Sequence, residues 1–134
     1  LDTDVDAIMN ATREKLKDYD LLMVNIKGTD LSGHDGLPEQ KQQFIEKIDS
    51  AVAELDGIEN VYCAFTGDHS TPVSIMDHSG DPLPLTICGE QVRTDDVNEF
   101  NERACSKGGL CRIKGKDLLN ILLDLSNRAE KFGA

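Results

Sequence analysis

The chain has 134 residues, a length that fits one domain with a core of its own. Its 14 basic and 25 acidic residues give a formal net charge of −11, which argues against nucleic acid and anionic membranes as partners because both require clustered Lys and Arg. No apolar run approaches the ~18 residues of a membrane-spanning helix.

The first predicted elements are a helix and a strand. Apolar residues recur at helical spacing within 4–17, which predicts a helix with Asp2 or Thr3 as its N-cap. Residues 19–28, YDLLMVNIKG, form a short apolar run that ends in glycine. Such a run predicts a buried strand.

A loop and a second helix come next. Residues 29–40, TDLSGHDGLPEQ, contain Gly, Ser and Pro, and this content predicts a loop. Pro38 then opens a predicted amphipathic helix over 38–55, since proline is favoured in the first turn of a helix. Gly57 is expected to end it.

Two more strands and a final helix complete the pattern. Residues 59–67 and 83–89 are apolar runs that predict buried strands, and 115–132 predicts a strongly amphipathic helix. Strands that alternate with helices indicate an α/β fold, in which a largely parallel sheet is flanked by helices.

The three histidines all follow predicted strands. His34 lies after the first strand, and His69 and His78 lie between the second and the third, each directly after an aspartate. In parallel α/β sheets, ligands bind beyond the carboxyl ends of the strands. We therefore expect the histidines to belong to a ligand site.

The side chains in these segments are of the types that bind catalytic cations. Asp30 and His34 are four residues apart, so one helical or turn-like winding can present both to one ion. Asp68 and His69 can both face a ligand if they lie on a glycine-rich turn, and His78 adds a further imidazole. Carboxylates and neutral imidazoles are common ligands of Zn²⁺ and Mn²⁺. The alternative is that each histidine is a solvent-facing loop residue or a structural hydrogen-bonding group.

Other motifs do not fit their patterns. DTDVDA lacks the glycine of a calcium loop, and GLCRIKGK has one residue too many for a phosphate loop. The spacing of the four cysteines favours reduced thiols over disulfides or a zinc site; they are Cys63, Cys88, Cys105 and Cys111.

Three stretches together resemble a known family. They are NIKGTDLSGHDG, FTGDHSTPVSIMDHSGDPLPLTICG and KGGLCRIKGKDLLNILLDLSNRAEKFGA. They are similar to the C-terminal part of archaeal-type 2,3-bisphosphoglycerate-independent phosphoglycerate mutases, which belong to the alkaline phosphatase superfamily. The resemblance covers nearly all of the chain from Tyr19 onward and implies an alkaline-phosphatase-like α/β fold.

The resemblance also implies a site for two divalent cations. Asp30, His34 and His78 match the ligands of one ion, and Asp68 and His69 match ligands of the other. Mn²⁺ is the first expectation for the metal, with Mg²⁺, Zn²⁺ and Co²⁺ as alternatives. In the family, a metal-bound serine accepts the phosphoryl group and returns it to the other hydroxyl of glycerate.

No serine of this chain matches that nucleophile, so we expect no catalytic residue here. Residues 1–134 are expected to be the C-terminal part of the metal-binding phosphatase domain, without the N-terminal nucleophile segment and the cap domain. The fragment alone should then be inactive. Four serines lie close to the expected ligands without matching the nucleophile: Ser32, Ser70, Ser74 and Ser79.

The implied activity of the full-length protein is the interconversion of 2-phosphoglycerate and 3-phosphoglycerate in the cytoplasm. The expected partner is this small phosphorylated acid, with neither nucleic acid nor membrane, and the oligomeric state stays open. Two alternatives remain. One is another phosphotransferase or phosphohydrolase of the same superfamily, and the other is a non-catalytic domain that kept the fold.

Overall fold

The computed structural model describes residues 3–130. These residues form two compact units. The helical unit contains the residues up to Gly57 together with His69–Asp81, and the strand unit contains Ile58–Asp68 together with the residues from Pro82 onward. His69 and His78 therefore belong to the same unit as Asp30 and His34.

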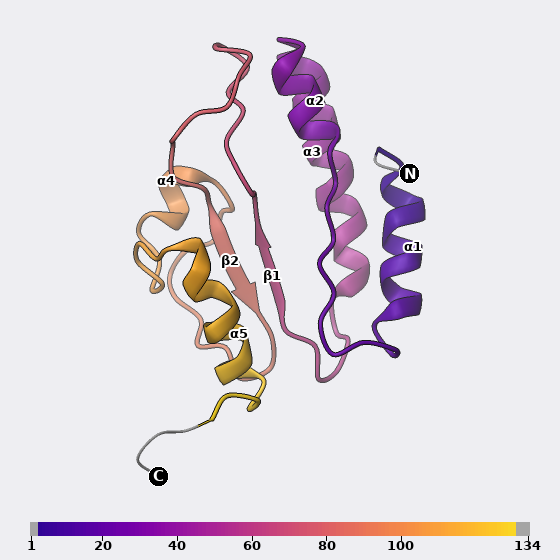
Figure 1. Cartoon of the computed structure of the whole chain (residues 1–134), viewed down its shortest axis with the longest axis vertical. Coiled ribbons are helices and arrows are strands. Elements are labelled where there is room, and N and C mark those ends of the chain that lie inside the picture. Colours follow the sequence, from indigo (N-terminus) through magenta and orange to yellow (C-terminus); the bar gives the residue numbers. More distant parts are fainter. Residues whose placement is uncertain (1–2, 131–134) are drawn as a thin grey trace. The chain divides into compact units, whose positions relative to one another are not determined.

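Helices α1 and α3 lie side by side in the helical unit (Figure 1). α1 spans Val5–Lys15, and α3 spans Pro38–Val52 and continues into the 3₁₀ turn η1, Ala53–Leu55. Both helices predicted in this part of the sequence are thus confirmed. The core that they share is made of Val5, Met9 and Ala51, with Ile26, Phe44, Ile48, Val52 and Leu55 packed against it.

The N-cap of α1 is Asp4. The sequence predicted Asp2 or Thr3 as the cap. That prediction is wrong for Thr3, and Asp2 lies outside the described residues. The Asp4 carboxylate accepts a hydrogen bond from the backbone N–H of Ala7 at 3.1 Å. A capping side chain must reach the amide of the second or third helical residue. Asp4 satisfies that condition because the helix begins at Val5.

The strand predicted at 19–28 does not form. Residues 21–26 are an irregular connection, and α2 begins at Gly28. The expected burial is also wrong, since Met23 is 93% exposed and Leu21 57%. A strand needs a neighbour for its backbone N–H and C=O groups, and no segment within residues 3–130 pairs with this one.

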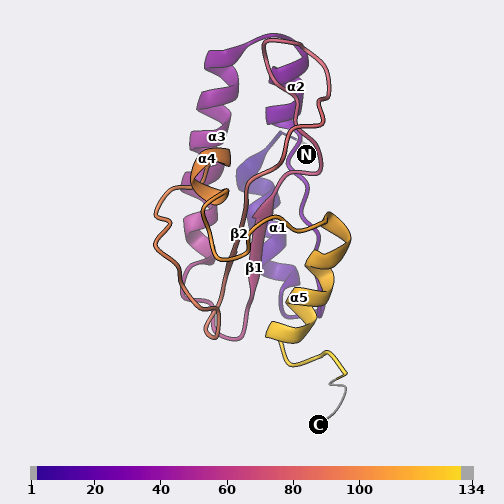
Figure 2. The ribbon, with the colours of Figure 1, turned by 90° about the vertical axis from the view of Figure 1, so that its left-hand side faces the viewer.

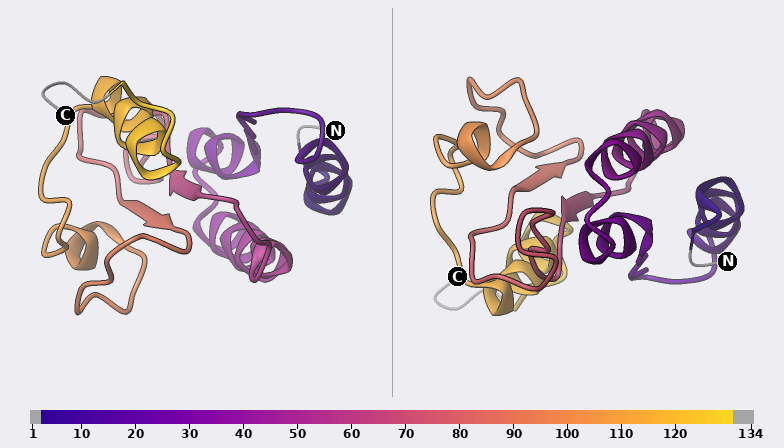
Figure 3. Two further views of the ribbon diagram at one scale, coloured as in Figure 1. Left: turned by 90° about the horizontal axis from the view of Figure 1, so that it is seen from below. Right: turned by 90° about the horizontal axis from the view of Figure 1, so that it is seen from above.

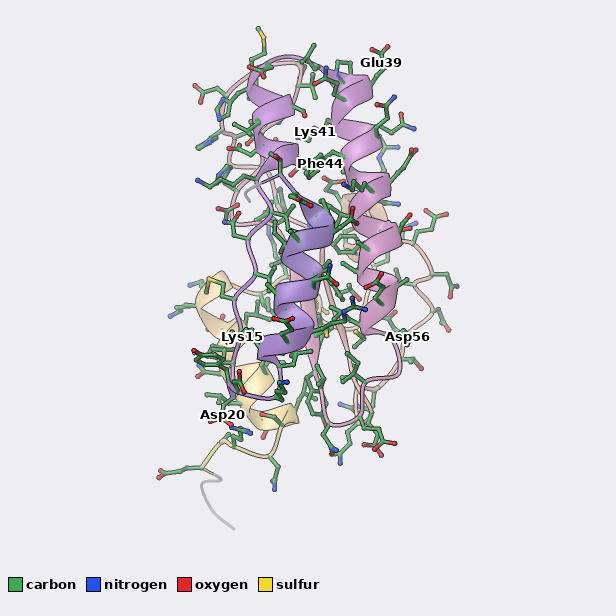
Figure 4. The ribbon with its side chains drawn as sticks, turned by 90° about the vertical axis from the view of Figure 1, so that its right-hand side faces the viewer. Lys15, Asp20, Glu39, Lys41, Phe44 and Asp56 are labelled. Atoms are coloured by element: carbon green, nitrogen blue, oxygen red, sulfur yellow. The ribbon has the colours of Figure 1, made fainter. Side chains whose placement is uncertain are left out.

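Helix α2, Gly28–His34, occupies the first half of the predicted loop. Glycine in a sequence normally indicates a turn, but two glycines of α2 permit close packing instead. A side chain at Gly28 would collide with the ring of Phe44, which lies on the side of α3 that faces α2 (Figure 4). A methyl group at Gly33 would come 2.5 Å from the carbonyl oxygen of Thr71.

The strand unit contains a two-stranded antiparallel ladder. Strands β1, Cys63–Thr66, and β2, Leu85–Cys88, lie within the predicted strands 59–67 and 83–89. They run side by side with Cys63 opposite Cys88 (Figures 2 and 3). The predicted largely parallel sheet is not confirmed, because this antiparallel pair is the only sheet within residues 3–130.

The C-terminal helix is shorter than predicted. α4 spans Glu102–Cys105, and after the 3₁₀ turn η2, Gly115–Asp117, α5 spans Leu118–Leu125 rather than 115–132. The chain turns at Asn127, whose φ of 55° is left-handed and incompatible with a continuing helix; the last two residues of the predicted helix lie outside the described part. No helix within residues 3–130 is long and apolar enough to cross a membrane.

Candidate metal centre

Helix α2 places two predicted ligands on one face. Asp30 and His34 are one helical turn apart, so their side chains point to the same side of the helix. Asp30 Oδ1 lies 3.5 Å from His34 Nε2. The side chains are 31% and 37% exposed respectively, which leaves both groups accessible to a small ligand. Of the two windings that their spacing allows, helical or turn-like, the structure has the helical one.

The other two histidines lie on the segment His69–Asp81, called the metal-site loop below. An isolated antiparallel bridge joins Ser70 to Ser79 and closes this loop, with the Ser79 N–H donating to the Ser70 carbonyl at 2.9 Å. The closure brings the two imidazoles together, so that the ring centroids of His69 and His78 are 3.8 Å apart. Residues far apart along the loop thus meet at its base.

Asp30, His34 and His78 converge with the geometry of a ligand set. His34 Nε2 and His78 Nε2 are 3.2 Å apart, and His78 Nε2 lies 3.8 Å from Asp30 Oδ1. Two ligands that bind one ion at about 2.0–2.2 Å lie about 2.8–3.6 Å from each other in octahedral or tetrahedral geometry. The observed separations are close to that range, so the three residues fit one divalent cation.

The hydrogen bond of His34 leaves the lone pair of its Nε2 available to bind such an ion. Its Nδ1 lies 3.1 Å from the carbonyl oxygen of Met76. A carbonyl only accepts hydrogen bonds, so Nδ1 carries the proton in the neutral ring and Nε2 carries the lone pair. Nε2 is the atom that faces His78 and Asp30. A backbone acceptor on the far side of a ligating imidazole is a common feature of metal sites.

Asp30 is held in its ionised form. The hydroxyl of Thr71 donates to Asp30 Oδ1 at 2.6 Å, and this hydrogen bond is the main cause that lowers the pKa of the carboxyl. Desolvation opposes it by raising the pKa, and the three nearby histidines lower it further. An ionised carboxylate is the form that binds a cation.

The structure places His69 beside this cluster as well. His69 Nδ1 lies 3.9 Å from Asp30 Oδ1 and 3.1 Å from the Thr71 hydroxyl oxygen. Asp68 belongs to the strand unit. The sharing of a second cation by Asp68 and His69 therefore stays a prediction, whereas the first set is seen together.

Two residues near the ligands were not predicted from the sequence to belong to the site. Thr71 is 4% exposed and contacts Asp30, and its carbonyl accepts a hydrogen bond from Lys41 Nζ at 2.7 Å. The signal for Thr71 was its place two residues after His69, in GDHSTP. Lys41 lies on α3 (Figure 4). It stands in a polar stretch of the sequence, EQKQQ, which gave no signal for a role at the site.

Comparison with known proteins identifies the family. The profile of the metalloenzyme superfamily matches residues 1–125. The chain belongs to this superfamily. Membership implies a divalent metal, and the cluster of Asp30, His34 and His78 provides a set of residues able to hold one.

Several relatives carry the same name. The chain is 54% identical to a protein of Methanothermobacter thermautotrophicus named 2,3-bisphosphoglycerate-independent phosphoglycerate mutase 1, with 100% of this chain and 33% of that protein covered. It is 50% identical to a mutase of the same description from Thermococcus kodakarensis, with 98% and 33% covered. The chain thus spans about a third of the length of these relatives.

A solved structure supports the fold. The PH0037 protein from Pyrococcus horikoshii matches with a TM-score of 0.93 and 48% identity, over 98% of this chain and 41% of that one. The superfamily and this neighbour together fit an alkaline-phosphatase-like α/β fold.

Proposed function

We propose that this chain supplies ligands to a two-cation site for phosphoryl transfer, and that the full-length protein interconverts 2-phosphoglycerate and 3-phosphoglycerate. The observation that carries the proposal is the convergence of Asp30, His34 and His78. The reaction is taken from the names of the relatives, each of which is about three times as long as this chain.

Each ligand has a distinct task in this proposal. Asp30 supplies the negative charge that attracts the first ion, while His34 and His78 direct Nε2 atoms at the same point without adding charge. Asp68 and His69 hold the second ion. When bound, the two cations, Mn²⁺ by preference, supply the positive charge that stabilises the transferring phosphoryl group.

The nucleophilic serine is proposed to lie in a segment of the full-length protein outside residues 1–134. Two of the serines near the ligands are engaged elsewhere: the Ser32 hydroxyl donates to the Gly28 carbonyl at 2.9 Å, and the Ser79 hydroxyl donates to Asp81 at 2.6 Å. This supports a serine from another segment that forms a phosphoserine intermediate. In this view the chain is the C-terminal part of a phosphatase domain, whose parallel sheet is completed by further strands in a cytoplasmic protein.

The test measures metal content and turnover of the intact protein. With Mn²⁺, the wild type should bind two ions and interconvert the two phosphoglycerates. His78→Ala should lose the first ion and lower turnover by more than about 100-fold, because a catalytic cation contributes several kcal/mol. Asp35→Ala is the matched control, since Asp35 is exposed next to His34 but is not a ligand.

Three outcomes would contradict parts of the proposal. A wild type without bound metal would refute the cation site. Hydrolysis of other phosphate monoesters without mutase activity would favour a different enzyme of the superfamily. Turnover by residues 1–134 alone would show that the nucleophile lies on this chain.

A further inference from the structure

Thr71 contacts the ligand cluster, although the sequence predicted no role for it. It is 4% exposed. Its hydroxyl oxygen lies 2.6 Å from Asp30 Oδ1 and 3.1 Å from His69 Nδ1. One buried hydroxyl group therefore touches a ligand of the first proposed ion and a ligand of the second.

The directions of these two hydrogen bonds follow from a count of protons. A hydroxyl has one hydrogen to donate, and an ionised carboxylate can only accept. The hydrogen of Thr71 is therefore directed at Asp30, and a lone pair of the hydroxyl oxygen faces His69. His69 Nδ1 must then be the donor, so the neutral ring carries its proton on Nδ1 and its lone pair on Nε2.

Thr71 is itself held from two other elements. Lys41 Nζ, from α3, donates to its carbonyl oxygen at 2.7 Å. Gly33, from α2, is packed so closely that an added methyl carbon would lie 2.9 Å from Thr71 Cγ2. Backbone and side chain are thus both fixed, which a group must be if it is to orient others.

We propose that Thr71 is a positioning residue that fixes Asp30 in place and selects the His69 tautomer whose Nε2 binds metal. This inference rests on the proposed two-cation function. Thr71 thereby links the two ligand sets through one hydroxyl group, in the way that the Met76 carbonyl orients His34 alone. Groups that hydrogen-bond to metal ligands in this manner tune both ligand orientation and affinity.

Two substitutions separate the hydroxyl from the packing. Thr71→Val keeps the shape and removes the hydroxyl, while Thr71→Ser keeps the hydroxyl and removes a methyl group. Thr12→Val is the matched control, because Thr12 is also buried, at 8% exposure, and its hydroxyl bonds only to the Ile8 carbonyl in α1. It reports what the loss of a buried hydroxyl does to the protein in general.

The first readout is Mn²⁺ affinity of the intact protein by titration calorimetry. Thr71→Val should weaken binding by about 10- to 100-fold, whereas Thr71→Ser and Thr12→Val should stay within about threefold of the wild type. Equal affinity in Thr71→Val, or an equal loss in Thr71→Ser, would overturn the inference and leave the proposed function intact. No Mn²⁺ binding by the wild type would overturn both.

The second readout does not need metal. Nitrogen-15 NMR of the metal-free protein, at a pH where imidazole is neutral, distinguishes a protonated Nδ1 from a protonated Nε2. The wild type should show His69 with its proton on Nδ1, and Thr71→Val should shift His69 toward the other tautomer. A wild-type His69 with its proton on Nε2 would overturn the inference whatever the metal affinities are.

Discussion

The close approach of Gly33 to Thr71 predicts that Gly33→Ala damages the metal site. The new methyl carbon would lie 2.5 Å from the Thr71 carbonyl oxygen. Relaxing that contact to 3.0 Å, a distance below which such contacts are essentially never found, moves Thr71 by about 0.5 Å. The obstacle is backbone, so it cannot rotate away as the end of a side chain would.

The change in the free energy of unfolding caused by Gly33→Ala is the balance of two opposing effects. Replacing a helical glycine by alanine normally stabilises by about 1 kcal/mol, while forcing an extra methyl group into a packed contact costs about 1–3 kcal/mol. The clash with a main-chain atom favours the upper half of that range, so we expect a net destabilisation of about 1–2 kcal/mol. The shift of Thr71 should also lengthen its 2.6 Å hydrogen bond to Asp30 and weaken Mn²⁺ binding.

Urea unfolding of the metal-free intact protein, followed by Mn²⁺ titration of each variant, measures both effects. Gly80→Ala is the matched control, because Gly80 lies in the metal-site loop and an added carbon there meets nothing within 4 Å. A Gly33→Ala protein that is more stable than the wild type and binds Mn²⁺ equally well would refute the reasoning. Loss of binding in Gly80→Ala would show that the whole loop is sensitive to substitution.

Three further predictions concern single groups. Lys41→Met should destabilise the protein by about 1 kcal/mol in urea unfolding because it removes a charged donor from a loop carbonyl. Lys47→Met, on the same helix, breaks only an exposed ion pair with Asp6 of α1 and should cost less than about 0.5 kcal/mol. Two backbone N–H groups lower the pKa of Asp95, so its stabilising effect is complete above about pH 4 and is lost as the pH falls through its lowered pKa. Acid unfolding curves should show a smaller loss of stability on acidification in Asp95→Asn than in the wild type, and no such change in Asp96→Asn. Burial and the thiol opposite it raise the pKa of Cys63, so alkylation at pH 7.5, followed by mass spectrometry, should modify it more slowly than the two exposed cysteines.

Local spacing predicted the first ligand pair because its geometry is local. A separation of four residues places Asp30 and His34 on one face once the segment is helical, whatever the rest of the chain does. The same spacing argument could not find Thr71 or Lys41. Their roles depend on α3 and the metal-site loop meeting α2, and such contacts between distant segments leave no periodic trace in the sequence.

The strand predicted at 19–28 does not form because a strand depends on contacts that are not local. Its composition is that of a strand, with Leu22, Val24 and Ile26 in alternation, and the local prediction was reasonable. A strand is completed only by a neighbour, and residues 3–130 offer none to this segment. Similarly, the sequence predicted the positions of β1 and β2 but not their antiparallel pairing, since pairing is decided by which segments meet.

The charge of the chain and the charge of the site have opposite consequences for an anionic substrate. The net charge of −11 repels a phosphorylated acid. Within the first ligand set, however, Asp30 is the one carboxylate beside two imidazoles that are neutral when they bind metal. A divalent ion held by these three groups leaves a local charge of about +1, so the site attracts phosphate where the rest of the surface does not. A carboxylate in place of the His78 imidazole would cancel that charge. If the proposed function is correct, His78→Asp should retain an ion, yet titration calorimetry should show weaker binding of phosphoglycerate to the intact protein than in the wild type.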